Sequence, residues 1–221
     1  LTEIGMTNFI AAYHGYDDSE LQKKLATCYS TACPELNYRA PHIGQKRKPG
    51  RIRVGFVSAH LGSHTIGKLN QALISGLNKN KFESHIFFLG SNKQTKSYIL
   101  DRFGHNIDKI FFSDQTLSSM RSTISKSELD ILYYPDIGME PLSYFLGFSR
   151  LAGVQCVTWG HPVSTGISTI DYFISSQLTE IPTSNAQYTE KLLRLKWFST
   201  DYAKPNLENL RKSRRDFKNF P

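Results

Sequence analysis

Two histidines, a serine and a lysine lie close together in the first half of the chain, at His60, Ser63, His64 and Lys68. An imidazole in a loop titrates near neutral pH and can take a proton from a hydroxyl group. We therefore predict that His64 acts as a general base. The alternative is a surface histidine that only hydrogen-bonds to the backbone. His60 has the weaker case and is expected to close the end of a strand.

The residues around these side chains predict a strand, a loop and a helix. Ile52, Val54 and Phe56 alternate along a run that is typical of a buried strand. Apolar residues then recur at helical spacing from Leu69 to Leu77. In a parallel sheet, the glycine-containing loop between them lies at the edge where open α/β folds bind ligands.

Strands and helices continue to alternate along the chain, at intervals of roughly 25 residues that are typical of α/β proteins. Further strands are expected at residues 82–90, 106–113, 129–138, 153–162, 170–176 and 191–198. Helices are expected at 93–103, after 138, and from about 116 to 125, the last capped by Ser113 or Asp114. The predicted fold is α/β: a Rossmann-like, doubly wound, mostly parallel sheet with a short helical lead-in.

The lead-in is expected to contain a helix that begins near Asp17 and ends before Pro34. Its apolar stripe should pack on the sheet or on another helical segment, and it consists of Leu21, Leu25, Cys28, Tyr29 and Ala32. We expect a helical connector at residues 1–45, a Rossmann-like domain at 46–200 and a basic linker at 201–221.

Polar residues just after the expected strands are candidates for one site, because the carboxyl ends of parallel strands meet at one edge. Asp136 and Glu140 either orient a histidine there or place negative charge at a helix N-terminus. Besides His64, the residues expected to line the site are Ser63, Thr65, Lys68, Asp136, His161, Pro162, Ser164, Thr165 and Gly166.

A phosphate-binding loop is a rival interpretation of the first candidate loop. Residues 62–68 match the pattern G-x-x-x-x-G-K and follow a strand. The next position is Leu69, where Mg²⁺ coordination requires a serine or threonine hydroxyl. A P-loop nucleotide-binding domain is therefore the less favoured alternative.

Composition narrows the function classes. The net charge of +8 comes largely from residues 46–53 and from the tail after 210, which look like linkers, so no nucleic-acid partner is expected. The three cysteines lack metal-ligand spacing, and free thiols in a reducing compartment are expected. No apolar run approaches the roughly 20 residues that span a bilayer, and no signal peptide is apparent. We expect a cytoplasmic protein without a metal or other cofactor.

Several long blocks carry a family resemblance, among them RIRVGFVSAHLGSHTIGKL, ILYYPDIGMEPLSYFLGFSRLAGVQCVTWGHPVSTGISTIDYFISS and QYTEKLLRL. With these blocks in this order, the chain resembles bacterial proteins of the SPINDLY / O-linked N-acetylglucosamine transferase family. The resemblance implies a GT-B glycosyltransferase, with two Rossmann-like domains and a cleft between them. Tetratricopeptide-repeat helices usually precede the first domain, so residues 1–45 would be the end of such a region.

Members of this family transfer a sugar from a nucleotide sugar, typically UDP-GlcNAc, to Ser or Thr hydroxyls of acceptor proteins. They invert the anomeric centre and use no catalytic metal. Relatives use GDP-fucose on hydroxyls or UDP-glucose on asparagine, so the resemblance fixes neither donor nor acceptor.

The resemblance also assigns residues. His64 matches the family's active-site histidine, which would assist removal of the acceptor proton or position the attacking hydroxyl. Residues 160–166 match a turn that lines the cleft, with His161 in place of an aromatic residue. Asp136 lies where many members carry asparagine. A second domain that binds most of the nucleotide would follow Pro221, which leaves this chain the acceptor-side half of the active site. The rival from a different class is a non-catalytic module that binds partner proteins.

Overall fold

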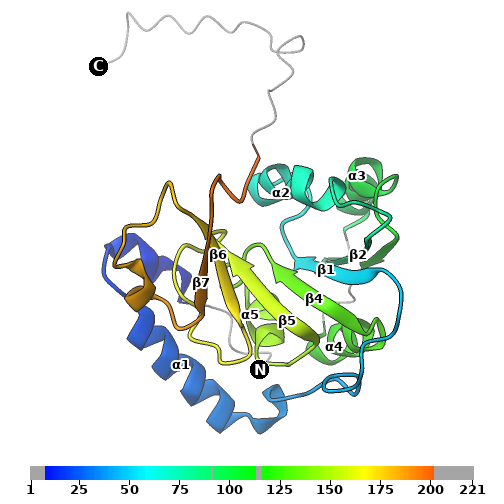
Figure 1. Ribbon diagram of the computed structural model, residues 1–221. Helices are drawn as coiled ribbons and strands as arrows, with labels where there is room; N and C mark the ends of the chain where they lie inside the picture. The colour runs from blue at the N-terminus through cyan, green and yellow to red at the C-terminus, as the bar shows by residue number, and fades with distance from the viewer. Residues whose placement is uncertain (1–7, 91, 113–115, 202–221) are drawn as a thin grey trace, which may run out of the picture.

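The computed structural model describes residues 8–90, 92–112 and 116–201, and its centre is a parallel β-sheet between layers of helix (Figure 1). Seven strands lie in the order β3-β2-β1-β4-β5-β6-β7, and every pairing in this sheet is parallel. The strands are β1 (Ile52–Ser58), β2 (Phe82–Phe88), β3 (Lys109–Phe112), β4 (Leu129–Tyr134), β5 (Ala152–Thr158), β6 (Tyr172–Ser176) and β7 (Lys191–Leu195). The predicted doubly wound α/β fold is confirmed.

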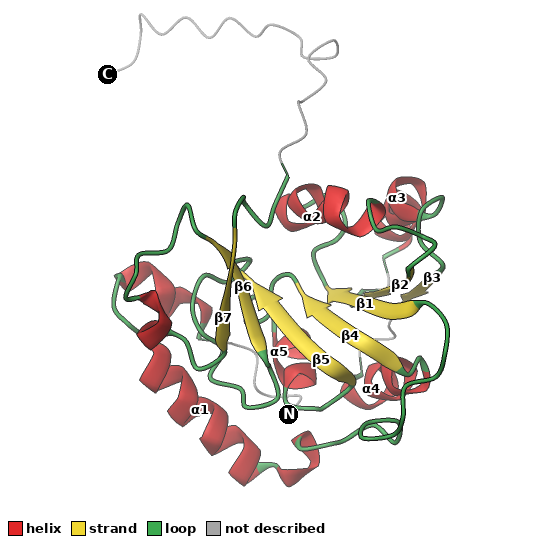
Figure 2. Cartoon of the chain, in the orientation of Figure 1, coloured by secondary structure: helices red, strands yellow, loops and turns green. Residues whose placement is uncertain are grey.

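Helices cover both faces of the sheet (Figure 2). One face carries α2 (Thr65–Ser75) and α3 (Lys93–Phe103), and the other carries α4 (Leu117–Lys126) and α5 (Pro141–Gly147). Because β1 pairs with both β2 and β4, the chain winds outward from β1 in two directions. The strand order therefore reverses between β1 and β4, and open sheets bind ligands at this switch point.

An apolar core lies on each side of the sheet. Along β1, Phe56 packs on the side of Ile74 from α2, whereas Val57 joins the cluster that contains Ile124 from α4. Gly55, directly before Phe56 on β1, has no room for a side chain, because a Cβ there would lie 2.4 Å from Leu129 Cδ1. The strand alternation read from the sequence is thus the alternation between the two cores.

The lead-in packs directly on the sheet domain. It contains η1 (Phe9–His14), α1 (Ser19–Ala32) and η2 (Pro34–Leu36). The backbone N–H of Ala40 donates to Arg150 O at 2.9 Å, which ties this segment to the loop before β5. A further 3-10 turn, η3 (Ser184–Gln187), precedes β7. No helix in the described part of the chain is both long and apolar enough to span a membrane.

The predicted apolar stripe of α1 was largely wrong. The buried residues of α1 are Ser19, Gln22 and Ala26, while Leu21 remains 45% exposed. A close backbone approach explains this orientation, because Gly166 lies against the Gln22 backbone and leaves room only for small or flat groups. Of the predicted stripe, Tyr29 packs against the core, whereas Cys28 and Ala32 are exposed and Leu25 is half-buried.

The predicted cap of α4 also needs correction. Thr116 is the N-cap, and its side chain accepts a hydrogen bond from Ser119 N at 3.2 Å. Ser113 and Asp114 lie outside the described residues. The expected strands exist in every case, although most end a few residues earlier than predicted.

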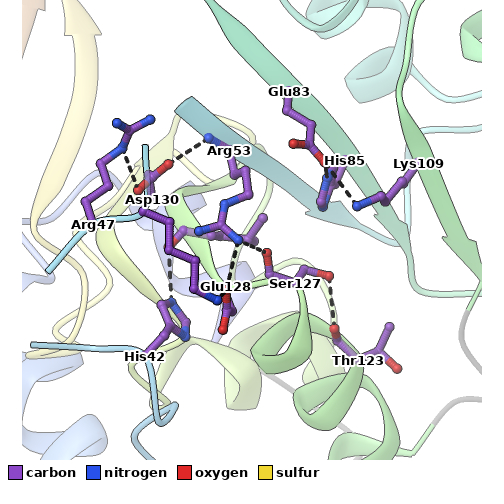
Figure 3. Close-up of polar contacts among 12 residues, drawn as sticks. His42, Arg47, Arg53, Glu83, His85, Lys109, Thr123, Ser127, Glu128 and Asp130 are labelled. Carbon is purple, nitrogen blue, oxygen red and sulfur yellow. Dashed lines mark hydrogen bonds and ion pairs between the residues drawn. The ribbon is translucent and has the colours of Figure 1, made fainter. Parts of the chain in front are cut away.

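Ion pairs occupy the amino edge of the sheet, opposite the switch-point loops (Figure 3). Arg47 Nε lies 3.0 Å from Asp130 Oδ1, and Arg53 Nη1 lies 3.2 Å from Glu128 Oε2. Lys48 also pairs with Glu128. Acidic partners in the same chain therefore offset much of the basic cluster at residues 46–53.

The core makes a direct prediction for stability. Phe87 is fully buried in β2 and stacks on Phe111 at a centroid distance of 5.0 Å. Replacing Phe87 with Ala should lower the free energy of unfolding by about 3–5 kcal/mol, measured by urea denaturation. Leu100→Ala on the exposed side of α3 is the control and should stay within about 0.5 kcal/mol of wild type. Equal losses in the two variants would contradict the assigned core.

Candidate functional site

Three loops meet at the carboxyl edge of the sheet, after β1, β4 and β5. The loops after β4 and β5 are joined by a hydrogen bond from Gly160 N to Pro135 O at 3.0 Å. Gly138 has a φ of 94°, and a Cβ on it would lie 2.3 Å from His161 Nδ1. The loops after β1 and β4 meet through the side chains described next. The structure thus brings together the loops that the sequence placed at one edge.

His64 is the N-cap of α2. Its backbone is extended, and its ring Nδ1 accepts a hydrogen bond from Ile66 N at 3.2 Å. A backbone N–H can only donate, so Nδ1 of the neutral ring must be unprotonated and the proton must reside on Nε2. The half-buried ring therefore offers a donor, Nε2–H, beyond the helix end. The alternative in which His64 hydrogen-bonds to the backbone is therefore correct for Nδ1. Nε2–H is not used by this cap and can donate to a bound group.

His60 lies beside His64, with ring centroids 4.7 Å apart. Its Nε2 is buried, has no hydrogen-bond partner in the part of the chain that the structure describes, and lies 3.9 Å from Asp136 Oδ2. Ser58 connects the two residues, because its Oγ donates to Asp136 Oδ2 at 2.8 Å and accepts from His60 N at 2.8 Å. The sequence analysis assigned His60 only a strand-closing role and missed this contact.

Asp136 is fully buried, so it lies behind His60 and does not line an open surface. Burial is the main cause that raises the pKa of Asp136 to about 8; the Ser58 hydrogen bond opposes the rise, and Glu140 contributes to it. Burial lowers the pKa of His60, and the neighbouring His64 lowers it further. At neutral pH the carboxyl and the imidazole are therefore both largely neutral.

The sequence analysis considered two roles for Asp136 and Glu140, orienting a histidine or placing negative charge at a helix N-terminus, and each residue takes one of them. Glu140 is the N-cap of α5 and accepts hydrogen bonds from Leu142 N at 2.7 Å and Ser143 N at 2.5 Å. Asp136 makes no such cap and faces a histidine instead. Glu140 therefore stabilises a helix start, and Asp136 is the carboxyl that belongs to the site.

The turn after β5 is more enclosed than a cleft-lining role suggests. His161 is 6% exposed, and its ring lies 5.0 Å from that of Phe9 in the lead-in. Burial lowers the pKa of His161. Pro162 is exposed and lines a hollow of about 110 Å³ between this turn and residues 16–19. In the described structure, His161 therefore faces the lead-in.

Ser164 and Thr165 are buried and hold a carboxylate of this chain. Ser164 Oγ donates to Glu190 Oε2 at 2.7 Å, and Thr165 N donates to Glu190 Oε1 at 2.8 Å. Gly166, with a φ of 69°, packs on the α1 backbone. The structure gives these groups partners within the chain, and a direct contact with substrate remains only a prediction for them.

The start of α2 rules out the phosphate-loop interpretation. Gly67 N donates to His60 O at 3.1 Å, and Lys68 N donates to His64 O at 3.2 Å. Gly67 lies inside the helix, where a Cβ would be 2.5 Å from Leu61 O. A P-loop needs its backbone N–H groups to point at the phosphates, and these are already used. Ser63, Thr65 and Lys68 are exposed around this helix start.

No group of three or more His, Cys, Asp or Glu side chains that could hold a metal ion occurs within residues 8–90, 92–112 and 116–201. The chemistry of the described site is therefore that of two imidazoles, one buried carboxyl and the exposed groups of the first turn of α2.

Comparison with known families adds a decisive observation: residues 24–211 match Glycosyl transferase family 41. The chain belongs to that family. The family 41 match includes all three loops of the site and every described strand, which agrees with the resemblance found in the sequence.

Individual relatives cover smaller parts of the chain. A probable UDP-N-acetylglucosamine–peptide N-acetylglucosaminyltransferase SEC of Arabidopsis thaliana is 26% identical over 75% of this chain. A UDP-glucose:protein N-beta-glucosyltransferase of Actinobacillus pleuropneumoniae is 36% identical over 37% of it. The aligned regions are only 17% and 13% of those relatives' lengths.

A solved structure agrees on the fold. A variant of the Thermobaculum terrenum O-GlcNAc transferase superposes with a TM-score of 0.61 at 24% identity, over 83% of this chain and 35% of that one. Similarity at this level concerns the architecture of the family 41 sheet and its helices.

The buried carboxyl predicts how stability depends on pH. The folded-state pKa of Asp136 is about 8, against 3.8 for an ordinary aspartate, so the folded protein retains a proton that the unfolded chain loses. This contribution to stability is complete below pH 3.8 and declines as pH rises toward 8. Relative to Asp136→Asn, the wild-type free energy of unfolding should fall over this interval in urea titrations. Parallel curves for the two proteins would contradict the buried neutral carboxyl.

Proposed function

We propose that this chain forms the acceptor-side half of the active site of a nucleotide-sugar-dependent protein glycosyltransferase. The proposed reaction transfers GlcNAc from UDP-GlcNAc to Ser or Thr hydroxyls of acceptor proteins. The observation that carries the proposal is the donor Nε2–H of His64 at the switch point of a family 41 fold. The SEC relative supports this donor, because its printed name specifies UDP-N-acetylglucosamine and a peptide acceptor.

In this proposal His64 positions the attacking hydroxyl. An Nε2–H donor can hold an acceptor oxygen while Nδ1 remains bound to Ile66 N. Removing a proton through Nε2 would require the other tautomer, whose Nδ1–H would face the Ile66 N–H. The exposed Ser63, Thr65 and Lys68 surround this point, and the Lys68 charge favours a nearby diphosphate.

The rest of the proposed enzyme follows the family resemblance. A second Rossmann-like domain binds most of the nucleotide sugar, the transfer uses no metal or other cofactor, and the protein acts in the cytoplasm. These statements rest on the resemblance alone.

A second candidate reaction has its own support. The N-glucosyltransferase relative has a higher identity, 36%, although over only 81 residues. Its printed name specifies UDP-glucose and N-linked transfer to protein, so glucose on asparagine is the competing donor and acceptor. A panel of UDP-GlcNAc, UDP-glucose and GDP-fucose with Ser/Thr and Asn acceptor peptides distinguishes the two.

The test compares two replacements of His64 in the full-length protein. His64→Asp keeps a side-chain oxygen that can cap α2 and has no N–H donor, whereas His64→Ala also loses the cap and about 1 kcal/mol of stability. Both should lower sugar transfer by roughly 100-fold, because both lack the Nε2–H donor. The measurement is transfer of radiolabelled sugar, with kcat and KM determined separately.

The Asp variant separates catalysis from folding. If His64→Asp transfers sugar at the wild-type rate, His64 is only a helix cap and its assignment to the site fails. If the wild-type protein transfers no sugar from any donor yet retains a protein partner, the chain is a binding module and the proposed function is wrong.

A further inference from the structure

His64 leaves the proposed reaction without a proton acceptor. Its Nδ1 lone pair is occupied by the α2 backbone, so its other nitrogen is a donor. Transfer to a hydroxyl or amide nevertheless releases a proton, which a group close to the attacking atom has to take. The neighbouring ring is His60, 4.7 Å away between centroids.

His60 presents its two ring nitrogens to different surroundings. Nε2 is buried, lacks a hydrogen-bond partner and faces Asp136. The side chain as a whole is 27% exposed, so atoms of His60 other than Nε2 reach the surface. Nδ1, the other ring nitrogen, is the one on the proposed substrate side. A base oriented by a carboxyl behind it, with its free nitrogen toward the substrate, is the arrangement found in catalytic triads.

The backbone around His60 is fixed, so only its ring has freedom to move. His60 N donates to Ser58 Oγ at 2.8 Å, and His60 O accepts from Gly67 N at 3.1 Å. The same Ser58 Oγ donates to Asp136 Oδ2, which fixes the carboxyl relative to the histidine backbone. The gap of 3.9 Å between His60 Nε2 and Asp136 Oδ2 is longer than a hydrogen bond, and a small ring rotation closes it.

We propose that His60 is the proton acceptor of the transfer reaction and that Asp136 is its positioning residue, a role that rests on the proposed glycosyltransferase function. His60 Nδ1 takes the proton of the acceptor group. The acceptor atom forms a bond to the anomeric carbon of the sugar, and the bond from that carbon to the nucleotide diphosphate breaks with its electron pair on the diphosphate. The Nε2 proton of His60 moves toward Asp136, and solvent later receives it.

The charges around the pair set its pH dependence. The ring of His64 lies beside that of His60 and disfavours a positive charge there, and Glu140 disfavours ionisation of Asp136. His161, on the adjoining turn, is buried and its pKa is lowered. The reactive form is the ionised carboxyl beside neutral His60, and it becomes populated as pH rises through about 8.

Kinetics of the full-length protein test the proposal. Wild-type kcat/KM should rise with pH to a plateau with an apparent pKa near 8. In Asp136→Asn the rise should move below 6.5, the ordinary histidine value, because His60 then titrates alone. His60→Gln should lower kcat by roughly 100-fold or more.

A matched control is available on β2. Glu83 Oε1 lies 2.9 Å from His85 Nε2, a carboxylate–histidine pair remote from the switch-point loops (Figure 3). Glu83→Gln disrupts that pair and should leave the pH profile of transfer unchanged. Near-normal turnover of His60→Gln, or an unchanged rise near pH 8 in Asp136→Asn, would overturn the proposal.

A measurement that does not depend on sugar transfer tests the His60–Asp136 pair separately from the proposed glycosyltransferase function. Long-range ¹H–¹⁵N NMR of the 221-residue chain reports which nitrogen of each histidine carries its proton. Near pH 9 we expect Nε2–H on both His60 and His64, and a step in the ring ¹⁵N shifts of His60 near pH 8, caused by ionisation of Asp136, that Asp136→Asn abolishes. A proton on Nδ1 of His60 near pH 9, or no such step, overturns the pair even if sugar transfer is found.

Discussion

The hydrogen bond from Ser58 to Asp136 joins the two strands at which the sheet reverses its order. Ser58 is the last residue of β1, and Asp136 follows β4 by two residues. Both side chains are fully buried, so water does not compete for the bond. Because the same Ser58 Oγ holds His60 N, one hydroxyl fixes the carboxyl and the start of the α2 loop together. The geometry of the site depends on this contact.

The two edges of the sheet use charge in different ways. At the amino edge, acids and bases meet in partly exposed pairs such as Arg47 and Asp130, where water screens them and each pair contributes little. At the carboxyl edge, Asp136 has no lysine or arginine partner among the described residues, and none of them hydrogen-bonds to its Oδ1. An unpaired buried acid costs stability unless it stays protonated. Buried acids with strongly raised pKa values are concentrated at functional sites.

The sequence predicted the architecture because that architecture follows from periodicity. Alternation along residues 52–57 and helical spacing after Leu69 report directly on which side chains are buried. The stripe of α1 failed because a backbone contact with Gly166 decides its orientation, and hydrophobicity carries no signal of such contacts. The cap of α4 failed because several adjacent polar residues have similar capping preferences.

The candidate site was predictable only as a set of loops. Strand order brings His64 and Asp136 to one edge, and the sequence pattern sufficed for that step. The separate roles of Glu140 and Asp136 could not be predicted from the sequence, because its pattern does not show that Glu140 caps α5 while Asp136 faces His60. Ser164 and Thr165 look like substrate-binding hydroxyls in sequence, yet they are bound to Glu190, which lies 25 residues farther along from Thr165.

The capping bond of His64 links the fold to the chemistry. An asparagine or serine could have started α2, but a histidine in this position has its tautomer determined by the helix backbone. The ring is thereby fixed as a hydrogen-bond donor, and a donor can orient a hydroxyl without removing its proton. Two imidazoles with centroids 4.7 Å apart cannot both become charged at low cost, which favours an arrangement in which one ring donates a hydrogen bond and the other accepts a proton. The buried carboxyl lies behind the ring that has a free nitrogen, so the local structure of two loops is sufficient to distinguish two histidines only four residues apart.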